Sequence, residues 1–212
     1  MKNTLKYPML AAALAVASSA QAYPNGDLLV GFTGGSSDFI YALGGVSALT
    51  PGQTWNIGTS LGMQFGVVGA LNTGSHIYAT SPDTSESGYA YDTAFFNQAK
   101  ANIGTIAGSL TVGLSRTTTP ADATGWTMQT DQAAGTPGNY LFNNLFNPNV
   151  SIASTASFFD NNAAGATPDG FFSYDATRGV LTYGVVPEPA SIGILAGLGL
   201  FAVVMRRRSF NV

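Results

Sequence analysis

The sequence contains no cysteine and only one histidine, His76. A chain without cysteine forms no disulfide, binds no metal through thiolate and has no thiol nucleophile. A lone histidine cannot by itself supply the ligands of a typical zinc site. These absences exclude disulfide scaffolds and thiol-dependent redox proteins, and they favour a hydrogen-bonded structural role for His76. We therefore expect no cofactor and no metal centre.

Charged residues are also scarce, at 9% of the chain against about 25% in an average soluble protein. Residues 23–185 carry three basic and ten acidic residues, a formal charge of −7. A negative surface repels phosphate groups, which excludes nucleic acid as a partner. Hydrophobic residues make up 45% of the chain, so the low charge does not indicate disorder.

The chain is instead rich in glycine and in uncharged polar residues, a composition typical of strands and turns. Short apolar runs separated by turn residues predict strands, and these runs are residues 26–32, 38–44, 63–68, 76–80, 111–114, 151–159 and 180–186. The turn clusters are 50–52, 72–74, 81–83 and 136–138.

Residues 92–110 follow a different pattern, because their apolar residues recur every three or four positions on one helical face. The stripe consists of Phe95, Ala99, Ile103, Ile106 and Leu110. Asp92 suits the N-cap position of this helix. We expect a mainly β domain over residues 23–185, an antiparallel sandwich or barrel-like fold with one amphipathic helix.

The N-terminus has the pattern of a secretory signal peptide over residues 1–22. Lys2 and Lys6 precede an apolar run, and small residues follow at Ala20 and Ala22. This order of basic, apolar and small residues predicts recognition by signal peptidase. Cleavage after Ala22 starts the mature chain at Tyr23.

The C-terminus combines three features in a fixed order. A Pro-Glu-Pro motif is followed by an uncharged run over 190–205 and then by an arginine cluster; the motif is Val186, Pro187, Glu188 and Pro189, and the cluster is Arg206, Arg207 and Arg208. As a helix, the run spans roughly 24 Å, short of the ~30 Å hydrocarbon core of a bilayer. The arginines are placed to stop the segment on the cytoplasmic side. This arrangement predicts transient membrane anchoring through 190–205 and later removal.

These C-terminal residues resemble the PEP-CTERM sorting signal of Gram-negative bacteria over residues 186–208. The resemblance implies recognition by an exosortase, which is a membrane-embedded protease or transpeptidase. It also implies export through the inner membrane and delivery to the cell surface or an exopolysaccharide matrix.

A second resemblance lies at the start of the mature chain. Residues 26–32 and 38–44 are similar to PEP-CTERM proteins that share an N-terminal domain of unknown function. This second resemblance implies no activity.

Candidate catalytic patterns in residues 23–185 are incomplete. Residues 58–62 match the G-x-S-x-G nucleophile elbow, but the only histidine follows with no acid between them. Oxygen ligands at Asp160, Asn161, Asn162 and Asp169 suit calcium, yet the same residue types are common in turns. A carboxylate pair for glycoside hydrolysis cannot be selected among ten acids.

We therefore expect a non-enzymatic surface or biofilm-matrix protein with a structural or adhesive role in association with exopolysaccharide. The alternative is a secreted carbohydrate-active enzyme that uses carboxylates not identified from the sequence.

Overall fold

The computed structural model describes residues 26–59, 61–81, 93–108, 110–130 and 148–185. The predicted signal peptide with Ala20, Ala22 and Tyr23 lies outside these ranges. The predicted sorting segment, with the motif 186–189, the apolar run 190–205 and the arginines 206–208, also lies outside them. Among the described residues, no helix is long and apolar enough to cross a membrane.

The described residues form one antiparallel sheet of ten strands, which confirms the mainly β prediction. The strand order is β3-β10-β9-β8-β5-β4-β1-β2-β6, with β7 paired to β4. The strands are β1 (Asp27–Thr33), β2 (Asp38–Gly45), β3 (Thr54–Asn56), β4 (Gln64–Leu71), β5 (His76–Ser81), β6 (Ser115–Thr118), β7 (Val150–Ser151), β8 (Thr155–Asn162), β9 (Gly165–Asp175) and β10 (Val180–Gly184).

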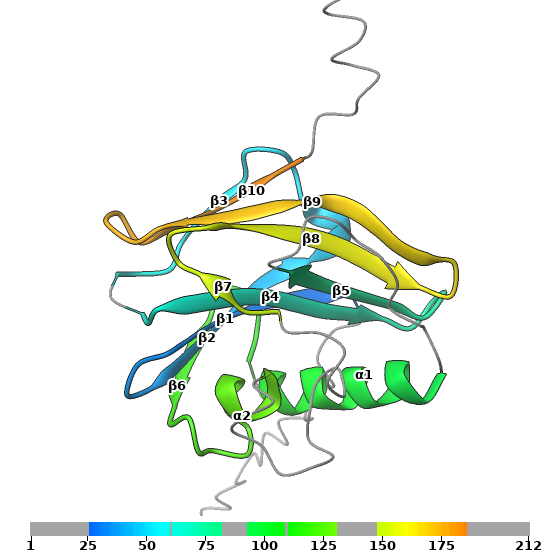
Figure 1. Cartoon of the computed structure of the whole chain (residues 1–212), viewed down its shortest axis with the longest axis horizontal. Coiled ribbons are helices and arrows are strands. Elements are labelled where there is room, and N and C mark those ends of the chain that lie inside the picture. Colours follow the sequence, from blue (N-terminus) through cyan, green and yellow to red (C-terminus); the bar gives the residue numbers. More distant parts are fainter. Residues whose placement is uncertain (1–25, 60, 82–92, 109, 131–147, 186–212) are drawn as a thin grey trace, which may run out of the picture.

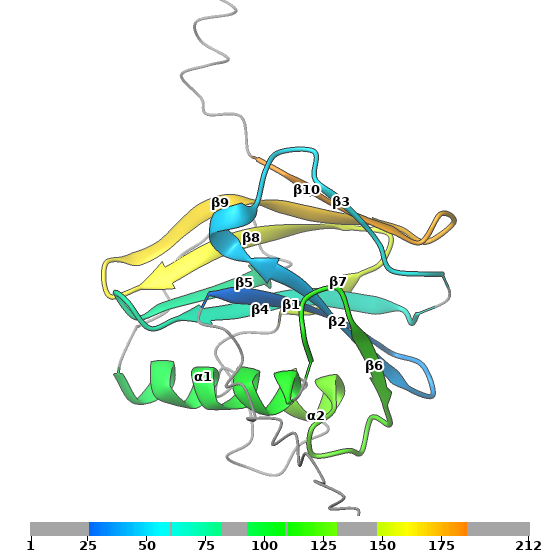
Figure 2. The same cartoon turned by 180° about the vertical axis from the view of Figure 1, so that it is seen from behind.

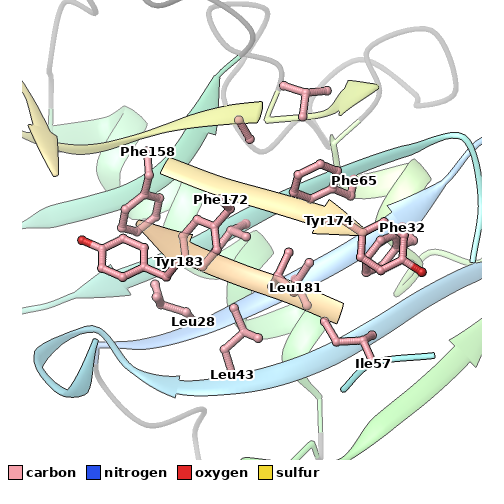
Figure 3. Packing of buried hydrophobic residues seen from close by; sticks show 14 of the residues in the cluster. Leu28, Phe32, Leu43, Ile57, Phe65, Phe158, Phe172, Tyr174, Leu181 and Tyr183 are labelled. Atoms are coloured by element: carbon pink, nitrogen blue, oxygen red, sulfur yellow. The ribbon is translucent and has the colours of Figure 1, made fainter. Parts of the chain in front are cut away.

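The sheet curls into a half-barrel, so that β8, β9 and β10 lie over β4, β1 and β2 (Figure 1). Large side chains fill the inner face between these two halves (Figure 3). Phe32, Phe65, Phe158 and Phe172 are fully buried there, and Tyr174 and Tyr183 are nearly so. Edge-to-face and tilted ring pairs join them, such as Phe158 and Phe172 with centroids 5.0 Å apart.

The outer face of the sheet is covered by α1 (Thr93–Ala107) and α2 (Trp126–Thr130), as Figure 2 shows. The predicted helical face is confirmed at Ala99, Ile103 and Ile106, which are buried against the sheet. The helix ends at Ala107, however, so Leu110 lies beyond it and is only partly buried. Phe96 adds a further buried ring. Asp92, the predicted N-cap, lies outside the described residues. The helix is followed by Gly108, whose φ of 52° is a left-handed conformation suited to glycine.

Strand β1 lies in the middle of the sheet and is buried on both faces. Leu28, Val30 and Phe32 point to the inner core, whereas Leu29 packs towards the helices. At Gly31 the Trp126 indole occupies the position where a Cβ would stand. This two-sided burial explains the continuous apolar run in the sequence.

Two strand predictions were wrong in position. Residues 111–114 form a turn, because Leu114 N–H donates to Thr111 O, and the strand begins at Ser115. The predicted strand at 151–159 is interrupted, because Ser154 N–H donates to Ser151 O in a turn between β7 and β8.

The longest strand, β9, was not predicted at all. Its sequence contains Pro168 and Gly170, which are turn residues in most contexts. Here they flank a β-bulge opposite Phe158 and Phe159, and a proline is tolerated at such a bulge. Gly170 has no space for a side chain, because Tyr183 and the Gly184 carbonyl lie against it.

Candidate functional site

One polar cluster lies on the inner face at the end of the sheet where the aromatic core stops. We call it the rim cluster and define it as His76, Tyr78, Asp160, Asn162 and Asp169. Strand pairing places His76 and Tyr78 of β5 beside Asn162 and Asp160 of β8, and Asp169 is the extra residue of the β9 bulge.

His76 and Asp160 form the centre of the rim cluster. His76 Nδ1 donates to both carboxylate oxygens of Asp160, at 2.6 and 2.8 Å. The two side chains remain 27% and 22% exposed, so solvent reaches the pair. The structure thus confirms the hydrogen-bonded histidine expected from the sequence, and it adds a partner 84 residues away in the chain.

Two turns hold this pair in position. The β4–β5 turn places His76 directly after Gly74 and Ser75, which both have left-handed φ angles of 77° and 55°. A side chain at Gly74 would meet the imidazole ring. On the other strand, Asn162 Oδ1 accepts from Ala164 N–H and begins the β8–β9 turn.

The second carboxylate of the rim cluster is that of Asp169. Partial burial, and then the neighbouring Asp160 carboxylate, raise the pKa of Asp169 above its ordinary value. The bulge therefore brings two acids into electrostatic contact that the sequence had placed nine residues apart. From the sequence, these two acids were grouped only as possible calcium ligands and were not identified as a carboxylate pair, because a bulge redirects a side chain without a distinct sequence signal.

Aromatic rings form the floor beneath these acids. The His76 ring stacks on Tyr78 with centroids 6.0 Å apart, and Tyr78 stacks on Phe158 at 6.2 Å. Burial, together with Asp160 and Asp169, raises the pKa of Tyr78 to about 12. Burial and Asp169 likewise raise the pKa of Tyr183 to about 12. Both phenols therefore stay protonated at neutral pH.

The G-x-S-x-G match lies at the opposite end of the sheet. Gly58 O accepts from Tyr174 O–H at 2.5 Å, beside the β9–β10 turn. The rim cluster adjoins Thr167 at the other end of β9. The seven residue steps from Thr167 to Tyr174 span roughly 23 Å. Ser60 lies outside the described residues, but Gly58 is in a loop between strands and far from His76, which does not fit a nucleophile elbow.

Several buried polar groups of the outer face form hydrogen bonds within the fold. The Asp38 carboxylate accepts from Thr127 N–H at 2.7 Å and Thr127 O–H at 2.6 Å. Trp126 Nε1–H donates to Asn149 Oδ1 at 2.6 Å. Asn149 is buried, so the Asn-Val-Ser sequence at 149–151 offers no accessible amide for a glycan in the folded domain.

No set of three or more His, Cys, Asp or Glu side chains in the described ranges is arranged to hold a metal ion. Of the residues weighed for calcium, Asp160, Asn162 and Asp169 lie in the rim cluster, on the paired strands β8 and β9. Asn161 is buried and donates to Ile77 O, away from the rim cluster.

The last described strand leads directly into the C-terminal segment. Strand β10 ends at Gly184, and the Val185 side chain that follows is 43% exposed. The folded domain is therefore a mainly β unit whose sheet ends just before the Pro-Glu-Pro motif.

Comparison with family models identifies that segment: residues 185–208 match the PEP-CTERM protein-sorting motif. The chain thus carries a C-terminal sorting signal of exported proteins, which implies processing by an exosortase and a cell-surface or extracellular location. No curated protein and no solved structure matches the chain.

Proposed function

We propose that the folded domain is a non-enzymatic surface or matrix protein that binds exopolysaccharide through the rim cluster. The observation that carries the proposal is the partly exposed group of His76, Asp160 and Asp169 over aromatic rings. Sugar hydroxyls both donate and accept hydrogen bonds, and imidazole, carboxylate and amide groups offer both partners. The sorting motif brings the domain to the compartment where such polymers are found.

The net negative charge of the domain favours neutral or amino-bearing polymers over acidic ones, because like charges repel. Binding to the producing cell's own exopolysaccharide can be measured by co-sedimentation. We expect Asp160→Asn and Asp169→Asn to weaken the binding severalfold. Asp175→Asn is the matched control, because this exposed acid lies at the other end of β9. If all three variants bound the polymer equally well, the rim cluster would not be the binding site.

A carbohydrate-active enzyme is the second candidate, and one observation favours it. Asp160 and Asp169 form a pair in which the pKa of one member is raised, the arrangement that separates acid and base roles in glycosidases. Release of reducing ends from the polymer, abolished by either substitution, would identify an enzyme. Binding without any release supports the adhesive role.

We also propose the processing order predicted from the two ends of the chain. Signal peptidase cuts after Ala22, the run 190–205 anchors the protein transiently, and an exosortase then acts at 186–189. The intact mass of the extracellular protein tests this order. We expect a chain from Tyr23 to the region of Pro187–Pro189, whereas a chain ending at Val212 and found only in membranes would show a lasting anchor.

A further inference from the structure

Strand β6 forms one edge of the curled sheet, next to β2. An edge strand presents unpaired backbone N–H and C=O groups that can pair with another chain. The pairing of β6 with β2 shows which groups these are. Ala42 N–H donates to Leu114 O at 3.0 Å, and the same register continues to Asp38 opposite Thr118.

Hydrogen-bonded pairs alternate along an antiparallel ladder. Since Leu114 bonds β2, Arg116 and Thr118 also bond β2. The N–H and C=O groups of Ser115 and Thr117 therefore point away from the sheet.

This edge lacks the charges that usually block strand addition. The exposed side chains are those of Ser115, Thr117 and Thr119. The one charged residue of the strand, Arg116, is turned inward, where Nη2 donates to Ile106 O and to Thr124 O. Beside the strand, Val112 and Leu114 are 55% and 57% exposed, two of the four exposed large hydrophobic side chains in the described part of the chain.

We propose that β6 is a homodimer interface, at which two copies of this chain pair antiparallel around a two-fold axis at Thr117. The exposed Leu114 side chain selects this register. Centring the pair on Arg116 would place Leu114 of each copy opposite Thr118 of the other, whereas centring it on Thr117 places Leu114 opposite Pro120. Thr117 of one copy then lies opposite Thr117 of the other, which is a favourable cross-strand pair.

The same register brings apolar groups together at both ends of the paired segment. Leu114 of each copy comes opposite Pro120 of the other, and Pro120 ends the pairing because it has no N–H. A two-fold contact of this kind is closed, since both copies use the same patch.

The other edge of the sheet is less suited to pairing. Strand β3 has three residues, and only Thr54 and Asn56 direct backbone groups outward, since Tyr183 N–H donates to Gln53 O and Ile57 N–H donates to Gly179 O. Pro51 precedes it closely. Growth through alternating edges into a fibre is thus not favoured.

The paired segment is short, so the dimer is a weak one that depends on concentration. In a crowded matrix, it doubles the number of rim clusters in one particle and so raises avidity for a polymer. The proposal does not depend on the rim cluster, because the two surfaces are at different strands.

A single-cysteine experiment tests the register, because the natural chain has no cysteine. In Thr117→Cys the two Cα atoms are about 5.5 Å apart in the pair, within disulfide range. In the control Ser115→Cys, the two copies of the substituted residue are separated by four positions, roughly 13 Å, which is too far. Oxidised, processed protein should yield a covalent dimer from the first variant only. Equal cross-linking of both variants, or of neither, would overturn the register.

Sedimentation of the processed protein over roughly 1 µM to 1 mM tests the association itself, with Kd expected in the weak range of small interfaces. Thr117→Pro removes an outward N–H and should abolish the dimer, whereas the control Thr54→Pro on β3 should leave it intact. Thr117→Lys repeats the test by opposing two ammonium groups, should the proline variant melt early. A monomer throughout the range, an open-ended series of oligomers, or a dimer lost only in Thr54→Pro would each contradict the proposal.

Discussion

The two faces of the sheet are closed in different ways. The inner face is sealed by aromatic rings from the sheet's own strands, such as Phe158 and Phe172, after the sheet curls over itself. The outer face is sealed by two helices and by one large wedge, Trp126, held by hydrogen bonds. On the outer face, the Asp38 carboxylate is buried and accepts two hydrogen bonds from Thr127, whereas the rim cluster at the end of the inner face still meets solvent. This difference explains why the candidate site lies on the inner face.

The largest expected change in the free energy of unfolding comes from removing the Trp126 side chain. Trp126→Ala empties a fully buried site and leaves Asn149 Oδ1 without its indole donor, so we expect a loss of about 3–5 kcal/mol in the free energy of unfolding. Urea denaturation measures it. Trp55→Ala is the matched control, because Trp55 is only partly buried at the inner core, and its loss should be clearly smaller. If Trp126→Ala and Trp55→Ala lost equal free energy of unfolding, the full burial of Trp126 would not be the cause of its effect.

The next effect concerns the polar contact between the outer face and α2. Asp38→Ala removes the acceptor of two charge-assisted hydrogen bonds from Thr127, and we expect a loss of about 2–3 kcal/mol. Asp175→Ala removes an exposed carboxylate that accepts from Thr177 N–H and Arg178 N–H in a turn, so its loss should be smaller, about 1 kcal/mol. Denaturant midpoints that agree for both variants would contradict this account.

At high pH, ionisation of two inner-face tyrosines, Tyr78 and Tyr183, should lower the stability of the fold. The pKa of Tyr78 and of Tyr183 is raised to about 12 in the fold, from an ordinary value of 10.0. The folded state therefore holds these protons more tightly, so their stabilising contribution is complete below pH 10 and is lost as the pH rises to about 12. Melting temperatures over pH 9–12 should fall, and Tyr78→Phe should reduce the slope. If the melting temperature of Tyr78→Phe fell with pH as steeply as that of the natural protein, ionisation of Tyr78 would not be a cause of the alkaline loss of stability.

A smaller, stabilising effect is expected on the side of α1 that contacts neither core. Gly104 is exposed and has open space around its Cβ position, so Gly104→Ala should add about 1 kcal/mol through helix propensity. Gly31→Ala is the opposite case, because its methyl group would overlap the Trp126 ring, and it should destabilise. Thermal melting tests both variants: the melting temperature should rise for Gly104→Ala and fall for Gly31→Ala.

The smallest effect is expected at the rim cluster. Because the pKa of Asp169 is raised in the fold, the ionised carboxylate weakens the folded state at neutral pH. Asp169→Asn should therefore raise the melting temperature slightly at pH 7, and the gain should disappear below the ordinary carboxyl pKa. A gain that persists at pH 3 would show that it does not come from the charge.

Local patterns in the sequence predicted much of the fold. The apolar run that became β1 and the helical stripe at Ala99, Ile103 and Ile106 were recognisable because burial imposes their periodicity. Strand β9 was missed because Pro168 and Gly170 are turn residues in most contexts, and the bulge that accommodates them has no sequence signal of its own. The candidate site was only partly predictable: His76 was expected to be hydrogen-bonded, but its partner was not identified.

The sequence by itself determined the sorting motif at the C-terminus, the β-rich composition and the low charge, because each depends on the order or frequency of nearby residues. Only the tertiary structure decided that His76 meets Asp160 and that Asp38 meets Thr127, pairs separated by 84 and 89 residues. Such contacts depend on strand register and on the docking of α2, which are set by the packing of the whole sheet and leave no local trace in the chain.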